Sequence, residues 1–390
     1  MSVYKLQNKI KHYEWGSPDL IPQFLGIENS KRLPFAEMWM GTHSGGPSIA
    51  VQDAEAPAKE LYLEEINGEP LPFLFKLLAV EKTLSIQAHP NKTQAIDGFI
   101  REEEMGITLR SPIRNYKDTN HKPEIICALT PFTIMAGFKD TKEIYSSFKG
   151  FVDFLPPLGE VFAPLLRSLE ADLLPTFFRM LYNLSKTERE YITGIILKYK
   201  TLENADAEGS FGKFSAFDFE QWKLIRSFAS LYEGDPSILS PLYLNIFTLK
   251  SGQAVSIPAG VLHAYNSGFG VELMANSDNV LRGGLTPKHV DVGELMNILK
   301  FNQFTPEIIT PPDDQAQYRY PAPYEDFSLS LLKSDGGEII FKKEKPAICI
   351  ITEGELETGK KLFKRSDSFF IPASEKEVAL RGRFSLFAAI

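Results

Sequence analysis

The stretch G-Q-A-V-S-I-P-A-G-V-L-H, residues 252–263, gives the clearest indication of how this chain folds. Gly252, Pro258 and Gly260 are turn-forming residues on either side of a short apolar run, so they predict a β-hairpin. The hairpin would deliver His263 on the next strand. His263 is then either a metal ligand or a residue that simply caps the hairpin.

A second stretch, L-S-I-Q-A-H-P at residues 84–90, predicts a short strand that ends at a proline. Because side chains alternate between the two faces of a strand, Gln87 and His89 lie on the same face. Two neutral donor side chains in this arrangement fit one side of a metal ion. Taken alone, a Gln-x-His pair is more often an ordinary polar strand face.

The segment N-H-K-P-E, residues 120–124, places dense polar chemistry directly before an apolar run. With Gln87, His89 and His263, its Glu124 gives a set of two nitrogen and two oxygen ligands. Such a set suits a tetrahedral or five-coordinate divalent ion that keeps a position for water or substrate. We therefore predict a metal site formed by these four residues.

The spacing G-x5-P-x-G-x2-H in residues 252–263 is similar to the second signature motif of the cupin superfamily, whose small β-barrels hold a metal in the barrel mouth. A weaker copy of the turn, S-F-F-I-P-A-S at residues 368–374, suggests a second barrel of the same type. No histidine follows Pro372. We therefore expect the second barrel to lack a metal.

Helical spacing with long polar faces replaces the strand pattern in residues 141–235. One expected helix runs from Leu158 to Leu174, and another begins at Lys186 behind Ser185 as its cap. We predict a mainly β fold with a helical insertion: two cupin-like jelly-roll β-barrels plus an α-helical domain. The expected domains are a catalytic cupin domain of residues 1–140 and 236–315, a helical insertion of residues 141–235, and a metal-free cupin-like domain of residues 316–390.

Composition restricts the class of partner. At 390 residues the chain is long for one core, and its net charge of −8 argues against a nucleic-acid or anionic-membrane partner. Cys127 and Cys349 lie in apolar runs, which indicates buried free thiols in a reducing compartment. No apolar run has the length of a signal sequence or a membrane span. We expect a cytoplasmic monomer.

Longer motifs resemble the type I mannose-6-phosphate isomerases: EWGS, AEMWMGTH, LFKLLAVEKTLSIQAHPNK, YKDTNHKPEI, IPAGVLHAY and VELMANSDNVLRGGLTPKHVDV. The resemblance extends from near the amino terminus to about residue 300, and the carboxy-terminal region departs from it. It implies one zinc ion held by Gln87, His89, Glu124 and His263. It also implies interconversion of mannose 6-phosphate and fructose 6-phosphate through a cis-enediol, without dependence on the carboxy-terminal region.

This chemistry needs a general base that works near neutral pH and an electrophile for the developing oxyanion. Lys122 and Glu272 are our acid–base candidates, although Glu272 fits a salt-bridged strand residue equally well. The resemblance places Arg282 in the active site, where it would stabilise charge or bind the phosphate. Further substrate- or phosphate-binding candidates are Ser85, Lys76, Lys288, His121 and Tyr265. His121 has alternative roles as the base or as a residue that orients a ligand, and an isolated lysine such as Lys76 more often reaches the surface.

Three other functions fit parts of the sequence. A cupin isomerase of another sugar phosphate would use the same proton chemistry. A non-catalytic sugar-binding double cupin would be expected to have lost metal ligands, whereas all four are present. An iron-dependent cupin oxygenase would more usually carry a His-x-His pair, where this chain has Gln87. The sequence therefore favours the isomerase.

Overall fold

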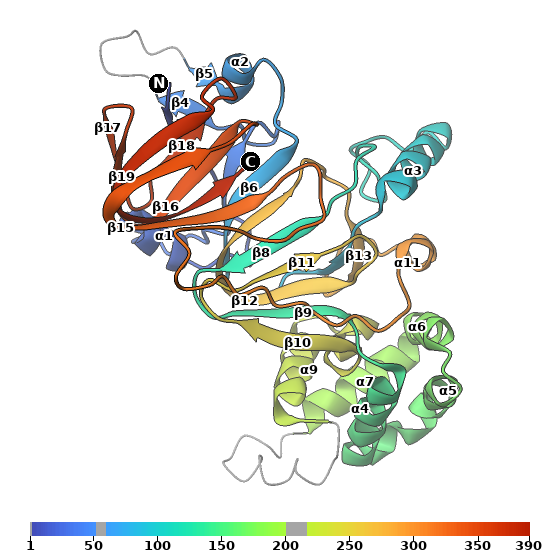
Figure 1. The fold of residues 1–390 in the computed structure, drawn as a ribbon. Coiled ribbons are helices and arrows are strands. Elements are labelled where there is room, and N and C mark those ends of the chain that lie inside the picture. The colour runs from blue at the N-terminus through green and yellow to red at the C-terminus, as the bar shows by residue number, and fades with distance from the viewer. Residues whose placement is uncertain (1, 52–59, 200–216) are drawn as a thin grey trace.

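The chain forms two β-sheets with helices beside them, as a computed structural model that describes residues 2–51, 60–199 and 217–390 shows (Figure 1). We call them the central sheet and the C-terminal sheet. The central sheet consists of β2 (Lys9–Lys11), β3 (Glu37–Gly41), β6 (Phe73–Val80), β7 (Ile86–Ala88), β8 (Glu124–Ala128), β9 (Phe132–Phe138), β10 (Leu244–Leu249), β11 (Ala254–Ile257), β12 (His263–Ala275) and β13 (Leu281–Gly284). The C-terminal sheet consists of β1 (Tyr4–Gln7), β4 (Ile49–Val51), β5 (Leu61–Tyr62), β14 (Gln317–Arg319), β15 (Leu329–Lys342), β16 (Ala347–Thr358), β17 (Lys361–Lys364), β18 (Ser368–Ile371) and β19 (Glu377–Ala389).

Strand β12 organises the central sheet. It pairs antiparallel with β6 and β8 along its second half and with β7 and β9 near its start. The predicted turn is present, since β11 ends at Ile257 and the next strand, β12, begins at His263. The predicted hairpin is wrong, because β11 pairs with β8, while β12 pairs with β6, β7, β8 and β9. One strand therefore carries both His263 and Glu272 and connects the remaining parts of the sheet.

The amino-terminal strand β1 lies in the C-terminal sheet, between β18 and β4. Its register pairs Tyr4 with Phe370 and Lys5 with Val51. Strand β1 of the expected catalytic domain thus pairs within the C-terminal sheet. The mainly β composition with helices is confirmed, while the jelly-roll description and the domain boundaries stay predictions.

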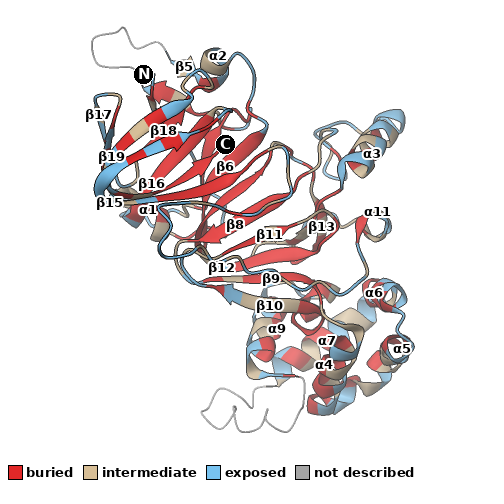
Figure 2. Ribbon diagram, in the orientation of Figure 1, coloured by how far each residue is buried: buried red, intermediate tan, exposed pale blue. Residues whose placement is uncertain are grey.

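The core between the two sheets follows from strand alternation. On β6, Phe73, Phe75, Leu77 and Ala79 pack in one apolar cluster with Ile348 and Phe387 of the C-terminal sheet. The alternate positions of β6, including Leu78 and Val80, face the opposite side, together with Ile126, Ile134 and Val255. We call this second side the inner face of the central sheet. Strands β6 and β8 are buried along their whole length (Figure 2).

Helices gather mainly at one end of the central sheet, beside β9 and β10 (Figure 1). Apolar residues at helical spacing, such as Ile144, Phe148 and Phe151, bury one side of α4. The helices are α1 (Leu20–Leu25), α2 (Leu63–Asn67), α3 (Lys92–Glu104), α4 (Thr141–Phe154), η1 (Pro156–Leu158), α5 (Gly159–Glu170), α6 (Leu174–Tyr182), α7 (Lys186–Lys198), α9 (Phe219–Leu231), η2 (Pro236–Leu239), α10 (Ser240–Tyr243) and α11 (Val292–Ile298). In the described ranges, none combines the length and apolar character needed to cross a bilayer.

Two helical predictions have different outcomes. Ser185 caps α7 as predicted, since its hydroxyl accepts a hydrogen bond from the Glu188 backbone N–H at 3.2 Å. The single helix expected over Leu158–Leu174 is wrong. The chain instead ends α5 at Glu170, adopts a positive φ of 57° at Asp172 and starts α6 with Pro175 in its first turn.

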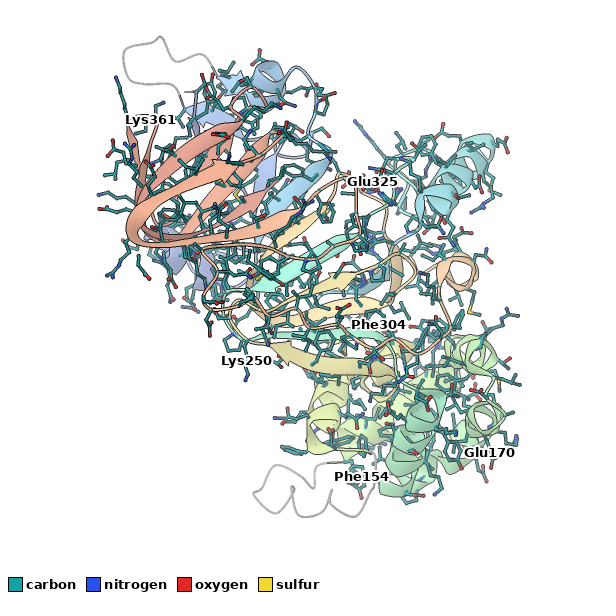
Figure 3. The ribbon with its side chains drawn as sticks, in the orientation of Figure 1. Phe154, Glu170, Lys250, Phe304, Glu325 and Lys361 are labelled. Carbon is teal, nitrogen blue, oxygen red and sulfur yellow. The ribbon has the colours of Figure 1, made fainter. Side chains whose placement is uncertain are left out.

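Residues 300–326 cross from the helical end to the C-terminal sheet, and Figure 3 labels Phe304 and Glu325 along this path. The crossing segment is held to the central sheet at several points. Ile309 forms a β-bridge with Ala254, and the Tyr320 hydroxyl donates to the Gly252 carbonyl at 2.8 Å. This segment therefore joins the two sheets through direct contacts with the central one.

Candidate metal centre and active site

Charged side chains line the inner face of the central sheet, where apolar residues would be expected. The residues beside them, Ile125 on β8 and Val271 and Leu273 on β12, pack in the core between the sheets. Strand alternation therefore directs Glu124 and Glu272 to the inner face. Lys76 joins them from β6, in register with Glu272. Charges in such a place are costly unless they are paired or bind a ligand.

His89, Glu124 and His263 form a compact buried group. One ligand atom from each lies within 4.8 Å of the others, as a metal site requires. His89 Nε2 is 3.2 Å from Glu124 Oε1, and His263 Nε2 is 3.3 Å from Glu124 Oε2. The structure thus brings together three of the four residues predicted from the sequence.

Hydrogen bonds on the far side of each ring determine which nitrogen carries the proton. His89 Nδ1 lies 2.8 Å from the Asn279 carbonyl oxygen, and His263 Nδ1 lies 3.0 Å from that of Val261. A carbonyl oxygen only accepts, so Nδ1 carries a proton in both rings, and in the neutral form of each ring Nε2 presents a lone pair. Burial, together with the Lys122 ammonium, lowers the pKa of His89 to about 4, which keeps this ring neutral.

Two lone pairs therefore face the oxygens of one carboxylate. Among the described residues, neither His89 Nε2 nor His263 Nε2 has a hydrogen-bond partner of acceptable geometry. Such an arrangement is repulsive by itself, and a cation among the three groups makes it favourable. Neutral imidazole and carboxylate are also the ligands that divalent zinc prefers. The residues present fit a metal.

Gln87 lies on a strand that pairs with the start of β12, as a metal ligand next to His263 would have to. On the short strand β7 it is opposite His263 of β12 on one side and opposite Arg282 of β13 on the other. Gln87 as the fourth ligand stays a prediction. The same register places Arg282 directly opposite Gln87, the predicted fourth ligand.

Lys122 contacts the metal group through Glu124. Its Nζ lies 3.2 Å from Glu124 Oε1, and both side chains are buried. Burial alone would raise the pKa of Glu124, but Lys122 and His89 outweigh it and hold that pKa well below its ordinary value. Glu124 is thus a carboxylate at neutral pH, with a lysine beside it.

A second buried ion group lies on β6 and its neighbours. Lys76 Nζ is 2.9 Å from Glu272 Oε2 and 3.7 Å from Glu37 Oε1, while the Trp39 indole N–H donates to Glu37 Oε2 at 2.5 Å. Burial alone would lower the pKa of Lys76, but the two carboxylates raise it above its ordinary value. Burial raises the pKa of Glu272, and Lys76 opposes that rise. Lys76 is therefore held between carboxylates and is not free to bind an anion.

The side chains of Arg282, Lys117 and Lys288 form a cationic end of the site. Burial, and then repulsion from Arg282 and Lys117, lowers the pKa of the Lys288 ammonium. The three are therefore close enough to interact, and their joint field would attract an anion. Sequence reasoning missed Lys117. It lies within the Y-K-D-T-N stretch, but no spacing rule connects it with Arg282.

The remaining predicted residues have varied surroundings. Tyr265 is buried and donates to Glu124 Oε2 at 3.3 Å, so it supports the metal group. His121 Nε2 lies 2.7 Å from Asp326 Oδ2, on the segment that leads into the C-terminal sheet. Its ring is thus engaged away from the other site residues. Ser85 directly precedes β7 and is partly buried.

An open hollow of about 440 Å³ adjoins this region. Its wall includes His43, Lys117 and Asp278, and His43 Nε2 lies 3.4 Å from Asp278 Oδ1. The hydrogen bond from His43 lowers the pKa of Asp278, with smaller contributions from Lys117 and Lys122. The hollow is therefore within electrostatic reach of Lys122 and has room for a small polar ligand.

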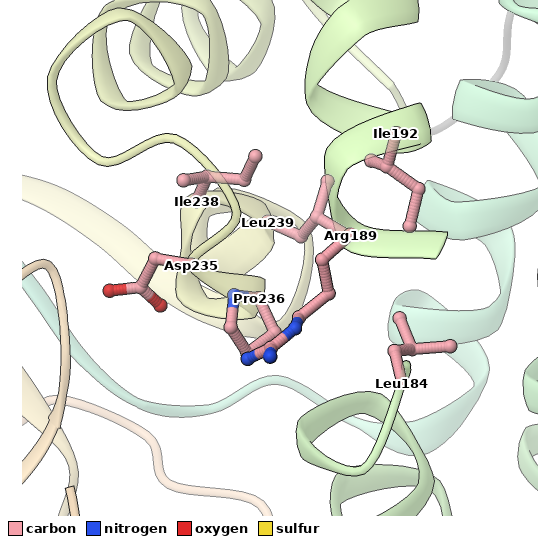
Figure 4. A pocket seen from close by; sticks show the side chains of 7 residues that line it. All are labelled: Leu184, Arg189, Ile192, Asp235, Pro236, Ile238 and Leu239. Atoms are coloured by element: carbon pink, nitrogen blue, oxygen red, sulfur yellow. The ribbon is translucent and has the colours of Figure 1, made fainter. Parts of the chain in front are cut away.

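A cavity in the helical region is of another kind (Figure 4). It measures about 10 Å³, and Leu184, Ile192 and Ile238 are among its lining residues. That is room for about one water molecule. This cavity is a packing defect and not a substrate site.

Comparison with known proteins agrees with the geometry. Residues 3–141 match the family model described as phosphomannose isomerase type I, catalytic domain. Mannose-6-phosphate isomerase of Escherichia coli is 35% identical over 401 residues, which cover 97% of each chain. The enzyme of Bos taurus is 30% identical and covers 96% of this chain and 94% of its own.

Solved structures show the same similarity in three dimensions. Mannose 6-phosphate isomerase from Salmonella typhimurium, bound to its substrate and to zinc, superimposes with a TM-score of 0.85 at 32% identity. The match covers 100% of this chain and 99% of that one. A zinc-bound holo structure of mannose 6-phosphate isomerase gives the same TM-score, identity and coverage. The chain therefore belongs to the type I phosphomannose isomerase family.

Proposed function

We propose that this protein is a zinc-dependent isomerase that interconverts mannose 6-phosphate and fructose 6-phosphate. The observation that carries the proposal is the buried His89–Glu124–His263 group, with both Nε2 lone pairs directed at one carboxylate. Lys122 contacts Glu124 of that group, and strand alternation directs Glu272 to the same inner face as Glu124. The relatives that match nearly the whole chain carry this activity in their names.

Gln87, His89, Glu124 and His263 would hold the zinc ion. When bound there, zinc supplies a Lewis acid that polarises the oxygens at C1 and C2 of the sugar. The protein contributes a rigid setting: the Asn279 and Val261 carbonyls fix the two rings, and Tyr265 bonds Glu124.

Proton transfer is the task of Glu272 and Lys122. In the direction of fructose 6-phosphate, the Glu272 carboxylate removes the proton from C2 while O1 gains a proton, which yields the cis-enediol. Glu272 then returns its proton to C1 while O2 loses one, so protons balance over the cycle. A carboxyl pKa raised by burial suits this role, because the base works best when its pKa approaches the ambient pH.

Lys122 moves the oxygen proton between O1 and O2 in this scheme. Its ammonium is fixed against Glu124, which places it next to the metal group and within the same buried space. Lys76 sets the charge of Glu272 by pairing with it at 2.9 Å. We therefore assign Lys76 to support of the base and no longer to the phosphate.

The phosphate would bind at the cationic end. Arg282 offers a two-pronged donor for phosphate oxygens, and Lys288 and Lys117 add positive charge. Ser85 remains a candidate donor from the start of β7. His121 Nε2 contacts Asp326 and the Tyr265 hydroxyl donates to Glu124, so we assign both residues to support of the site instead of to the substrate.

The test is conversion of mannose 6-phosphate to fructose 6-phosphate by purified protein, before and after chelation and zinc restoration. We expect activity to vanish with the chelator and to return with zinc. His263→Ala should lower kcat/KM by more than about 100-fold, beyond the usual cost of losing a group that supports a metal ligand. His12→Ala, a change of an exposed histidine bonded to the Pro34 carbonyl, is the control and should keep full activity. No turnover by zinc-loaded wild-type protein would refute the proposal.

A further inference from the structure

We propose that Asn279 is a positioning residue that holds the metal ligand His89 and the segment leading to Lys122 and Glu124 in one arrangement. The inference deepens the proposed function, since it rests on the metal site described above. Asn279 is fully buried, with 0% of its surface exposed, on the loop between β12 and β13. A buried polar side chain at this depth is stable only if its hydrogen bonds are made.

Both ends of the Asn279 amide bind the same short segment. Its Oδ1 accepts from the backbone N–H of Lys117 at 2.7 Å and of Asp118 at 3.2 Å. Its Nδ2 donates to the carbonyls of Asp118 and Asn120, both at 2.8 Å, and to Asp118 Oδ1 at 3.2 Å. One side chain thereby fixes residues 117–120 in five hydrogen bonds. The chain continues from there into Lys122 and Glu124.

The backbone of the same residue fixes His89. The Asn279 carbonyl accepts the His89 Nδ1 proton at 2.8 Å, which sets both the tautomer and the plane of the ring. Ser277 strengthens the connection, since its hydroxyl accepts from the Asn279 N–H at 3.2 Å and donates to Asp118 Oδ1 at 2.9 Å. Movement of Asn279 would therefore disturb two metal ligands that are far apart in the sequence.

His263 is held in a different way. Its Nδ1 bonds the carbonyl of Val261, only two residues away in the turn that precedes β12. The hydrogen bond that orients the His263 ring therefore does not involve the loop that carries Asn279. Loss of the Asn279 side chain should thus leave His263 in place and loosen His89, Glu124 and Lys122. We expect a metal site that is weakened and distorted but not abolished.

The test compares Asn279→Ala with Asn29→Ala. Asn29 is a matched control: both ends of its amide also bind backbone groups, at Pro18 and Leu33, in a loop near the amino terminus. The zinc dissociation constant is measured by competition with a chromogenic chelator, and the ligand geometry from the absorption bands of the cobalt(II)-substituted protein. Circular dichroism ensures that only folded protein is compared.

We expect Asn279→Ala to raise the zinc dissociation constant about 10- to 100-fold, as loss of support for metal ligands typically does. Its cobalt spectrum should shift, while Asn29→Ala keeps wild-type affinity and spectrum even if it melts earlier. Zinc affinity and cobalt spectrum both unchanged in folded Asn279→Ala would overturn the proposal.

Asn279→Asp is the second variant, in case Asn279→Ala does not fold. The aspartate keeps the shape of the side chain and an oxygen that accepts from the Lys117 and Asp118 N–H groups. Its second oxygen takes the place of the amide nitrogen that donates to three oxygens in the wild type. The same rise in the zinc dissociation constant supports the proposal, and a wild-type value overturns it. Both readouts are independent of turnover, so failure here is distinguishable from failure of the isomerase assignment.

Discussion

The two sheets contain the same three-residue turn core and use it differently. In the central sheet, I-P-A at residues 257–259 is closed by a hydrogen bond from the Val261 N–H to the Pro258 carbonyl at 3.4 Å. In the C-terminal sheet, I-P-A at residues 371–373 is closed by one from Glu375 to Pro372 at 3.1 Å. The local turn is therefore a shared frame. The residues after each turn, and the groups that they contact, distinguish a metal centre from a structural sheet.

The difference lies first in the residue after the turn. Gly260 adopts a φ of +79°, and its N–H donates to the His89 carbonyl at 2.9 Å, so the central turn docks on the strand end that carries a metal ligand. In the C-terminal sheet the Pro372 carbonyl is instead bound by Lys343 Nζ at 2.7 Å. The central turn thus connects two metal ligands, His89 and His263. The C-terminal turn is bound by the nearby Lys343.

The two sheets also differ in the kind of side chain that they bury. Residues of the C-terminal sheet such as Cys349, Ile351 and Phe369 form an apolar cluster. The inner face of the central sheet carries Lys76, Glu124 and Glu272, whose burial costs stability that only pairing or a ligand offsets. Function is therefore located where the sheet departs from ordinary packing.

The largest expected effect is that of Glu272→Gln in the central sheet. Loss of the base should lower kcat/KM about 10²- to 10⁴-fold. In the wild type, rate should rise with pH through a pKa above the ordinary glutamate range, because burial raises it and only the carboxylate acts as base. That acid limb should be absent in the variant. Cys349→Ala, a change inside the other sheet, should keep the profile, and a retained limb in Glu272→Gln would exclude this residue as the base.

Gly260→Ala should have an intermediate effect. An added Cβ would lie 2.8 Å from the Ile298 carbonyl oxygen, and a non-glycine residue at φ +79° is strained. We expect about 1–3 kcal/mol of lost unfolding free energy in urea denaturation, together with weaker zinc binding. Ser374→Ala, at the matching position of the other turn, should change stability by less than about 0.5 kcal/mol. Equal effects would remove the distinction between the two turns.

The smallest expected effect concerns the contact between His121 and Asp326, which connects the active-site region to the segment that enters the C-terminal sheet. Asp326, on the segment that enters the C-terminal sheet, binds His121 next to Lys122. Asp326→Asn weakens a bond worth about 1 kcal/mol, so we expect kcat/KM to fall by a factor of roughly five. Asp367→Asn, which removes a charge paired with Lys5 within the C-terminal sheet, should leave kcat/KM unchanged. An unaltered rate in Asp326→Asn would show that catalysis is independent of the carboxy-terminal region, as the sequence alone suggested.

The stabilisation that the His121–Asp326 contact provides should depend on pH. The hydrogen bond from His121 lowers the pKa of Asp326 below its ordinary value of 3.8. The stabilisation is therefore present above that ordinary value and is lost as pH falls through the lower folded pKa. Asp326→Asn should flatten this acid-side loss in a thermal melt series.

Short-range features of the molecule could be predicted from its sequence. The Gln87–His89 strand, the turn before His263 and the Ser185 cap all depend on neighbours within a few residues, and the structure has each of them. The prediction that both cysteines are buried and free is also confirmed.

Features that depend on register between distant strands could not be predicted. The pairing of Lys76 with Glu272 joins residues 196 positions apart, and alternation on either strand gives no information about its partner. The contact of His121 with Asp326 and the grouping of Lys117 with Arg282 have the same cause. Sequence patterns indicated the faces of the strands, while the choice of neighbours came from the folded sheet.

The position of β1 has a consequence for how the chain is made. Tyr4 pairs with Phe370, so β1 obtains this neighbour only after some 360 further residues have been made. Until then, the growing chain presents a strand edge open to other chains, and such edges invite aggregation. A product that stops before β18 keeps this edge open permanently. Strand β18 thus controls when the edge of β1 is covered, because only a chain that has reached β18 can pair with it.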